Sequence, residues 1–147
     1  MDNTYDIQAL FYQGSYTACI EAVQANATGA PSDPETQTLL LYGARSQIAL
    51  KQPSKALTLL PDSIDSPAAQ AVRALANYVQ AQIDGDSSRK EDILVELDEL
   101  LDQAIVGDAN GQTIRVCVAT AMARDDDPVG ALEALGMGSA SSKEIEW

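Results

Sequence analysis

The sequence predicts an all-α fold, a right-handed superhelical solenoid built from tetratricopeptide-like helix pairs. Three observations support this prediction. Apolar residues recur at helical spacing along nearly the whole chain, and no stretch of strand length alternates cleanly between apolar and polar residues. Capping residues and glycines divide the chain into short helical segments. Because the loops within pairs are short, neighbouring helices must run antiparallel.

The capping residues place helices in four pairs along the chain. The expected ranges are 5–13 with 16–26, 34–50 with 53–60, 67–83 with 89–105, and 111–124 with 128–135. Three helices are expected to start where a capping oxygen precedes a proline, since proline at the first helical position lacks only an N–H that would be unpaired anyway. These three starts are Asp33-Pro34, Ser66-Pro67 and Asp127-Pro128.

Glycines indicate where helices end, because glycine readily takes the left-handed conformation of a helix terminus. The expected stops are Gly14, Gly85, Gly107 and Gly136. Ser88 followed by Glu91 has capping-box spacing and is expected to start the helix at 89–105. This helix has the clearest amphipathic pattern. Its apolar stripe consists of Ile93, Leu97, Leu100, Leu101 and Ile105.

The helix pairs also repeat in sequence. Small residues follow the turns of three pairs at Cys19, Ala56 and Ala131, with separations of 37 and 75 residues. One further unit fits between the last two, namely the pair whose turn, Asp84 to Arg89, is expected to be longer. The separation is close to the roughly 34 residues of a tetratricopeptide repeat, which favours a solenoid. The alternative is a plain helical bundle whose small residues align by chance.

Charge and composition argue against several functional classes. The chain has 22 acidic side chains, 9 basic side chains and no histidine, a formal net charge of −13. Such a surface repels phosphate, which argues against direct binding to nucleic acid or to an anionic membrane. Without histidine, the commonest general base and zinc ligand are missing, so we expect no enzyme, no cofactor and no metal site. Cys19 and Cys117 lie among apolar residues and are expected to be reduced core thiols of a cytosolic protein.

Several short segments follow one another in a characteristic order and spacing. They are Phe11–Tyr16 with Cys19-Ile20, Leu41-Tyr42, Gln70–Arg73 with Tyr78, Ile93–Asp98, and Asp127–Leu132. Together they resemble the epsilon-subunit family of coatomer, the COPI vesicle coat. The resemblance implies a non-catalytic, all-helical structural subunit that binds the C-terminal region of the alpha subunit and associates with other coat subunits. It also implies a cytoplasmic protein, peripheral on Golgi membranes and COPI-coated vesicles, that supports Golgi-to-ER and intra-Golgi transport.

The resemblance further implies that this chain is the N-terminal half of such a subunit. Residues 1–140 are expected to form the repeat domain, with about four helix pairs. Residues 141–147 are expected to be the start of a truncated next helix. A solenoid normally ends in a capping repeat, and Trp147, the sole tryptophan, has none after it.

The first helices of the pairs are expected to line a concave groove that binds another polypeptide. The expected groove residues are Phe11, Tyr12, Leu41, Arg45, Ile48, Gln70, Arg73, Asn77, Thr113, Val116 and Thr120. The residues of the third pair rest on an alignment of Tyr42-Gly43-Ala44 with Ala74-Leu75-Ala76. Arginine and aromatic side chains are common anchors of protein interfaces, which favours Arg45 and Arg73 as binding residues. The alternative is that each arginine pairs with a nearby acid and that the tyrosines fill gaps between repeats.

A generic tetratricopeptide adaptor, which clamps an acidic C-terminal peptide as a cochaperone does, is the alternative function. Such an adaptor needs several lysines or arginines that converge in the groove. The four lysines lie at turns or in second helices, which argues against this function. They are Lys51, Lys55, Lys90 and Lys143.

Overall fold

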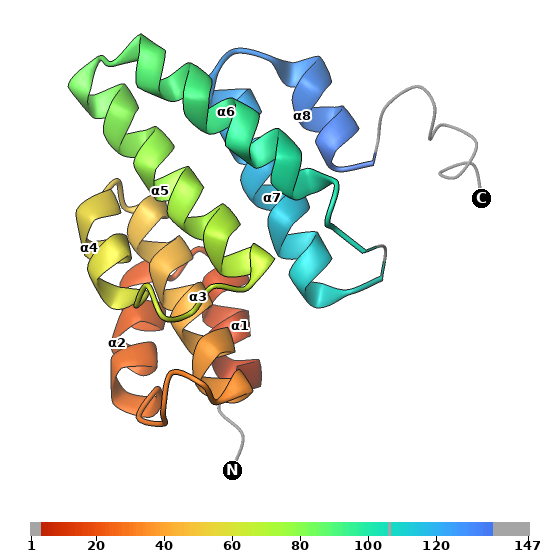
Figure 1. The fold of residues 1–147 in the computed structure, drawn as a ribbon. Helices are drawn as coiled ribbons and strands as arrows, with labels where there is room; N and C mark the ends of the chain where they lie inside the picture. Colours follow the sequence, from red (N-terminus) through yellow and green to blue (C-terminus); the bar gives the residue numbers. More distant parts are fainter. Residues whose placement is uncertain (1–3, 106, 137–147) are drawn as a thin grey trace.

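The computed structural model describes residues 4–105 and 107–136, and this part of the chain folds into helices and connecting loops alone (Figure 1). Its helices are α1 (Thr4–Tyr12), α2 (Tyr16–Asn26), α3 (Pro34–Ala49), α4 (Pro53–Leu59), α5 (Pro67–Asp84), α6 (Ser87–Leu101), α7 (Ala109–Arg124) and α8 (Pro128–Ala134). Each helix packs against the next, and the first helices α1, α3, α5 and α7 also contact one another in succession. The predicted all-α solenoid of helix pairs is therefore confirmed. The expected helix start at 141–147 lies outside the described residues.

Side-chain caps fix the starts of several helices. The three caps predicted before prolines accept backbone N–H groups as expected: Asp33 from Thr36 at 3.2 Å, Ser66 from Ala69 at 3.2 Å, and Asp127 from Gly130 at 2.9 Å. Asp86 caps α6 in the same way and accepts from the Arg89 N–H at 3.1 Å. The prediction that Ser88 starts this helix is wrong, because α6 already begins at Ser87.

One turn joins the two helices of each pair, and the four turns are similar. Each turn contains one residue with a positive φ: Gly14 at 79°, Lys51 at 60°, Gly85 at 70° and Asp126 at 58°. The next N–H donates to a carbonyl five residues back, the hydrogen bond of a Schellman turn. These bonds run from Ser15 to Leu10, Gln52 to Gln47, Asp86 to Ala81 and Asp127 to Met122. Two residues separate the helices of the third pair, against three in each of the other pairs, so the expectation of a longer turn is wrong.

The end of α6 differs from the prediction. The apolar stripe predicted a helix that continues to Ile105, whereas α6 ends at Leu101 and Ile105 is 66% exposed. The N–H groups of Gln103 and Ala104 donate to carbonyls only three residues back, so the backbone winds more tightly after Leu101 than in an α-helix. Ile105 is therefore out of line with the apolar stripe of α6. Gly14, Gly85 and Gly136 follow helix ends with positive φ, as predicted. Gly107 also has a positive φ but lies six residues after Leu101, so the prediction that it ends this helix is wrong.

Close packing of α2 and α4 on α3 depends on Gly43 in α3. A Cβ atom at this position would lie 2.7 Å from Leu59 Cδ2 and 2.9 Å from Val23 Cγ1. The glycine therefore lets α2 and α4 both rest on α3. Cys19 and Cys117 are buried and unpaired, as their apolar surroundings predict.

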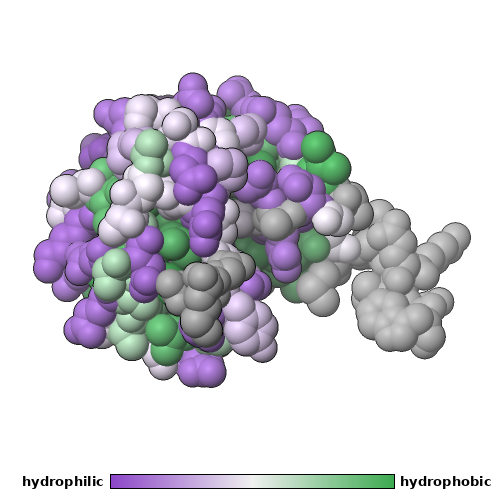
Figure 2. Space-filling view, turned by 90° about the horizontal axis from the view of Figure 1, so that it is seen from below, coloured by the Kyte–Doolittle hydropathy of each residue, from purple (hydrophilic) through white to green (hydrophobic). Residues whose placement is uncertain are grey.

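The face of the molecule drawn in Figure 2 is of mixed polarity, with hydrophilic side chains over much of it and hydrophobic ones between them. Among the described residues, no helix combines the length and the apolar character that a membrane crossing requires.

Candidate functional site

Four aromatic rings gather where the first two helix pairs meet. We call Phe11, Tyr12, Tyr16 and Tyr42 the aromatic cluster. The Phe11 ring centre lies 5.2 Å from that of Tyr12, 5.8 Å from that of Tyr16 and 5.4 Å from that of Tyr42. The rings meet edge-on or tilted, the arrangements that aromatic quadrupoles favour. The cluster therefore joins α1, α2 and α3.

Arg45 reaches from α3 over this cluster. Its guanidinium carbon lies 4.5 Å from the Phe11 ring centre and 5.7 Å from that of Tyr42, within the range of a cation–π interaction. Within the described residues, no carboxylate forms an ion pair with Arg45, although the chain carries 22 acidic side chains. The rings hold the arginine in place and leave its N–H donors for an external acceptor such as a carboxylate.

Burial keeps the Tyr42 hydroxyl and the thiols of Cys19 and Cys117 neutral at physiological pH. Burial, reinforced by the adjacent Tyr12 hydroxyl, raises the pKa of Tyr42 to about 12 despite the opposing effect of Arg45. Burial likewise raises the pKa of Cys19, and raises that of Cys117 to about 11. A thiol of raised pKa is a poor nucleophile. Among the described residues, no group of three or more histidine, cysteine or acidic side chains is placed to hold a metal ion.

A cavity of about 110 Å³ lies between α1, α3 and α7. The expected groove residues that line it are Tyr12, Leu41, Arg45, Thr113 and Val116. Side chains from the first helices of the first, second and fourth pairs thus line one cavity. We call this cavity and the aromatic cluster beside it the concave site.

The sequence prediction did not include several residues of this cavity. They are Gln8, Thr38, Tyr42, Asn110 and Gln112. Gln8 lies four residues before Tyr12, and Gln112 lies four residues before Val116. Residues three or four apart share a helix face, so extending each predicted face by one turn finds them.

Three expected groove residues of the first, second and fourth pairs lie outside the cavity lining. Phe11 is half-buried, and its ring face contacts the Arg45 guanidinium. Ile48 belongs to the core and is only 3% exposed. The Thr120 hydroxyl donates to the Val116 carbonyl at 2.7 Å, within α7.

The expected groove residues of the third pair face elsewhere, which corrects the prediction. The Arg73 guanidinium donates to the carbonyls of Pro61, at 2.8 Å, and Ile64 in the loop before α5. Its Nε atom lies 3.8 Å from the Asp62 carboxylate, too far for a hydrogen bond. Arg73 therefore fastens a loop to α5 and does not line the concave site.

Gln70 and Asn77 also point away from the concave site. Gln70 donates to the Asp65 carbonyl at 2.7 Å, and Asn77 accepts from Arg89 of α6 at 3.3 Å. The sequence alignment placed the third pair 32 residues after the second, whereas the equivalent positive-φ residues, Lys51 and Gly85, are 34 apart. The alignment is therefore shifted by two residues. A shift of two residues turns a position by about 200° around the helix, so the predicted residues lie on the opposite face.

The chain is similar to known proteins along most of its length. Residues 1–143 match the family model described as Coatomer epsilon subunit. Two curated relatives are Coatomer subunit epsilon-2 of Oryza sativa subsp. indica, 31% identical over 140 residues, and of Oryza sativa subsp. japonica, 30% identical over 140 residues. Each alignment covers 93% of this chain and 44% of the relative, so the chain spans less than half the length of these relatives. No solved structure matches the chain.

Proposed function

We propose a function from one premise: the chain belongs to the coatomer epsilon-subunit family, whose members are structural components of a vesicle coat. In this proposal the chain is a non-catalytic part of the COPI coat. Its concave site binds the C-terminal region of the alpha subunit, and the chain associates with other coat subunits. It works on the cytoplasmic side of Golgi membranes and vesicles, which it contacts only through the coat, and supports Golgi-to-ER and intra-Golgi transport.

The observation that carries this assignment is Arg45 held over the aromatic cluster without a carboxylate partner among the described residues. Arginine and tyrosine are the residue types that most often anchor protein interfaces. The adjoining cavity of about 110 Å³ is smaller than the roughly 300–1,000 Å³ of small-molecule sites, so it suits a single anchoring side chain of a larger partner. A carboxylate on the partner segment would pair with Arg45.

A binding experiment with an arginine variant tests the proposal. The chain is mixed with a C-terminal alpha-subunit fragment at micromolar concentration, and the two should elute together from a size-exclusion column. Arg45→Glu should weaken the association at least about tenfold by calorimetry, because it places a like charge opposite the partner's carboxylate. Arg89→Glu, in the exposed first turn of α6, is the matched charge-reversal control and should leave affinity unchanged.

Two outcomes would contradict the proposal. Separate elution of the two proteins would count against alpha-subunit binding. Unchanged affinity of the Arg45→Glu chain would show that the partner binds another face. Preferential capture of an acidic C-terminal peptide would favour the cochaperone-like adaptor, although Arg45 is the sole basic side chain in the described lining of the concave cavity.

A further inference from the structure

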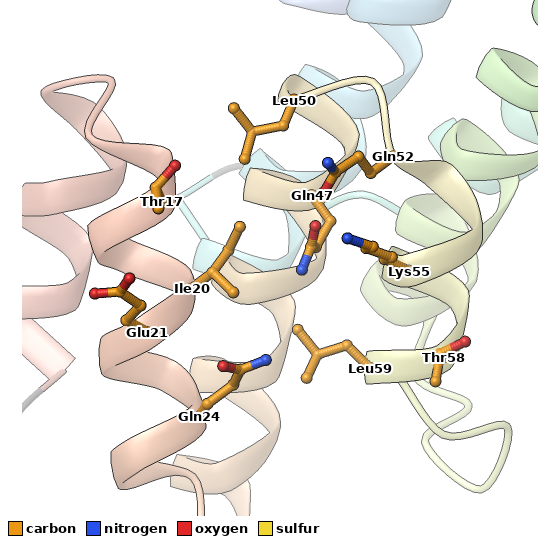
Figure 3. A pocket seen from close by; sticks show the side chains of 10 residues that line it. All are labelled: Thr17, Ile20, Glu21, Gln24, Gln47, Leu50, Gln52, Lys55, Thr58 and Leu59. Atoms are coloured by element: carbon orange, nitrogen blue, oxygen red, sulfur yellow. The ribbon is translucent and has the colours of Figure 1, made fainter.

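A larger cavity opens on the opposite side of α3, between the second helices α2 and α4 (Figure 3). Its volume is about 670 Å³, within the roughly 300–1,000 Å³ of small-molecule sites and about six times that of the concave cavity. Gln47 belongs to its lining and lies two residues beyond Arg45, about 200° further around the helix. The cavity, which we call the convex cavity, is therefore separate from the concave site.

The arrangement of three helices creates the convex cavity. Val23 of α2 and Leu59 of α4 both approach Gly43 so closely that a Cβ atom there would meet them. Gln47 lies one turn further along the same face of α3. At that level Figure 3 shows α2 and α4 standing on either side of Gln47. The opening is thus built into the helix packing.

Gln47 has an unsatisfied hydrogen-bonding group at this site. The residue is only 7% exposed, and its Oε1 atom is buried without a hydrogen-bond partner among the described residues. Figure 3 shows the side chain projecting from α3 into the space between α2 and α4. Buried polar atoms in native proteins are almost always hydrogen-bonded, so this oxygen has an unused acceptor, which a half-turn of the amide about its terminal bond presents to a donor in the cavity.

The polar lining matches the chemistry of a polypeptide backbone. Gln24 of α2, Gln47 of α3 and Gln52 before α4 contribute amides from three sides of the cavity. Each amide offers both donors and an acceptor, as does the backbone of an extended peptide. Ile20 and Leu59 add apolar surface that can contact the peptide's side chains.

The charge of the lining favours an uncharged occupant. Glu21 and Lys55 are its sole acid and base, so the lining has no net charge although the chain as a whole carries −13. A phosphate ligand would need several convergent basic groups, and a metal ion several acidic ones. Neither set is present among the described lining residues.

We propose that the convex cavity binds a short, extended, uncharged segment of a partner polypeptide, one of whose backbone N–H groups donates to Gln47 Oε1. This site acts independently of the concave site. It gives the chain two opposite faces through which it connects separate polypeptide segments.

A library of random linear heptapeptides displayed on phage tests the proposal. Selection on the unmodified chain should enrich peptides of no net charge. Synthetic copies should bind at least tenfold more weakly to Gln47→Met, measured by fluorescence anisotropy, and equally well to Gln103→Ala, an exposed glutamine outside the cavity. N-methylation of one peptide N–H should lower affinity for the unmodified chain tenfold and have little further effect on Gln47→Met.

A stability measurement separates binding from a structural role of Gln47. Methionine has a similar shape and lacks the unpaired acceptor, so Gln47→Met should keep or raise the melting temperature while it loses the peptide. A lower melting temperature would show that the amide has a partner within the fold and would overturn the proposal. Three other results would also overturn the proposal. The first is that the selection enriches no peptides, and the second is that the selected peptides bind the unmodified chain and Gln47→Met equally well. The third is that the chain binds a second copy of itself instead of peptides and that Gln47→Met abolishes this self-association.

Alpha-subunit binding distinguishes this proposal from the proposed function. Gln47→Met should leave the affinity for the alpha-subunit fragment unchanged, whereas Arg45→Glu should leave the affinity for the selected heptapeptides unchanged. If Arg45→Glu removes heptapeptide binding, the peptides occupy the concave site and the convex proposal fails. If the alpha fragment does not bind while Gln47-dependent peptides do, the proposed function fails alone.

Discussion

A single residue, Tyr78, connects the third and fourth helix pairs. Its side chain is completely buried, and its hydroxyl donates to Asp125 Oδ1 at 3.2 Å. Beside it, Gln82 of α5 and Arg124 of α7 form two hydrogen bonds, at 3.2 and 3.0 Å. Gln82 and Arg124 lie at the ends of α5 and α7, and together with Tyr78 they set how the last pair packs on the one before it. Tyr78 therefore fills a gap between repeats, one of the two roles that the sequence left open for the tyrosines.

We predict that Tyr78 makes stability fall at alkaline pH. Burial, with the Asp125 carboxylate beside the hydroxyl, raises the pKa of Tyr78 to about 12, whereas tyrosine in an unfolded chain titrates near pH 10. The neutral form is thus favoured in the fold. Its contribution is complete below about pH 10 and is lost as the pH rises through about 12, at about 1.4 kcal/mol per pH unit.

Urea denaturation between pH 8 and pH 12 measures this effect. Tyr78→Phe should be less stable than the unmodified chain at pH 8, by about 1 kcal/mol for the lost hydrogen bond, and should lose stability less steeply above pH 10. Tyr5→Phe is the control, because Tyr5 is 76% exposed, and its stability should follow that of the unmodified chain. Parallel curves for Tyr78→Phe and the unmodified chain would contradict the prediction.

At the scale of elements, the sequence predicted helix starts well and one repeat poorly. Caps such as Asp33 and Ser66 act through residues three positions away, so their sequence pattern is nearly sufficient. The third pair was misaligned because the prediction followed small residues. Five residues after the positive-φ position, this pair has Lys90, where the others have Cys19, Ala56 and Ala131. A lysine stem can lie along an apolar surface with its charge in water, so the fold accepts it there.

The turn of the second pair contains a strain that glycine should relieve. Lys51 has a φ of 60°, a conformation that costs a residue with a side chain roughly 1–2 kcal/mol. Lys51→Gly removes this cost but gives the unfolded chain more freedom, worth about 0.4–1 kcal/mol. We expect a net increase of up to about 1.6 kcal/mol in the free energy of unfolding, measured by urea denaturation.

Lys55→Gly is the matched comparison for this turn. Lys55 is an exposed residue inside α4, where glycine should lower stability by about 1 kcal/mol. Opposite signs for the two substitutions would show that the backbone of Lys51 is strained. An equal loss of stability in both would contradict the left-handed turn at Lys51.

At the scale of the whole molecule, the sequence predicted the architecture and part of the concave site. Tyr12, Leu41 and Arg45 meet as expected because a regular stack of pairs brings equivalent faces together. The convex cavity had no such signal. It depends on how α2 and α4 pack on either side of α3 next to Gly43. This packing does not appear as a repeat in the sequence.

Net charge acts on the stability of the whole molecule. The chain carries −13, and the ion pairs among the described residues are the long contacts Arg73–Asp62 at 3.8 Å and Arg89–Asp84 at 4.0 Å. Such pairs at exposed sites contribute little, so repulsion between like charges outweighs them. Raising NaCl from 10 to 150 mM shortens the screening length from about 30 to about 8 Å and should therefore raise the melting temperature.

A variant of lower charge checks that repulsion is the cause. Glu96→Lys with Glu99→Lys, both on the exposed face of α6, changes the formal charge from −13 to −9. The double variant should melt higher than the unmodified chain in 10 mM NaCl and gain less from added salt, because less repulsion remains to be screened. Glu96→Gln with Glu99→Gln should lie between the two. If salt instead lowers the melting temperature of the unmodified chain, attractive ion pairs outweigh the repulsion and the net charge does not limit the stability of this solenoid.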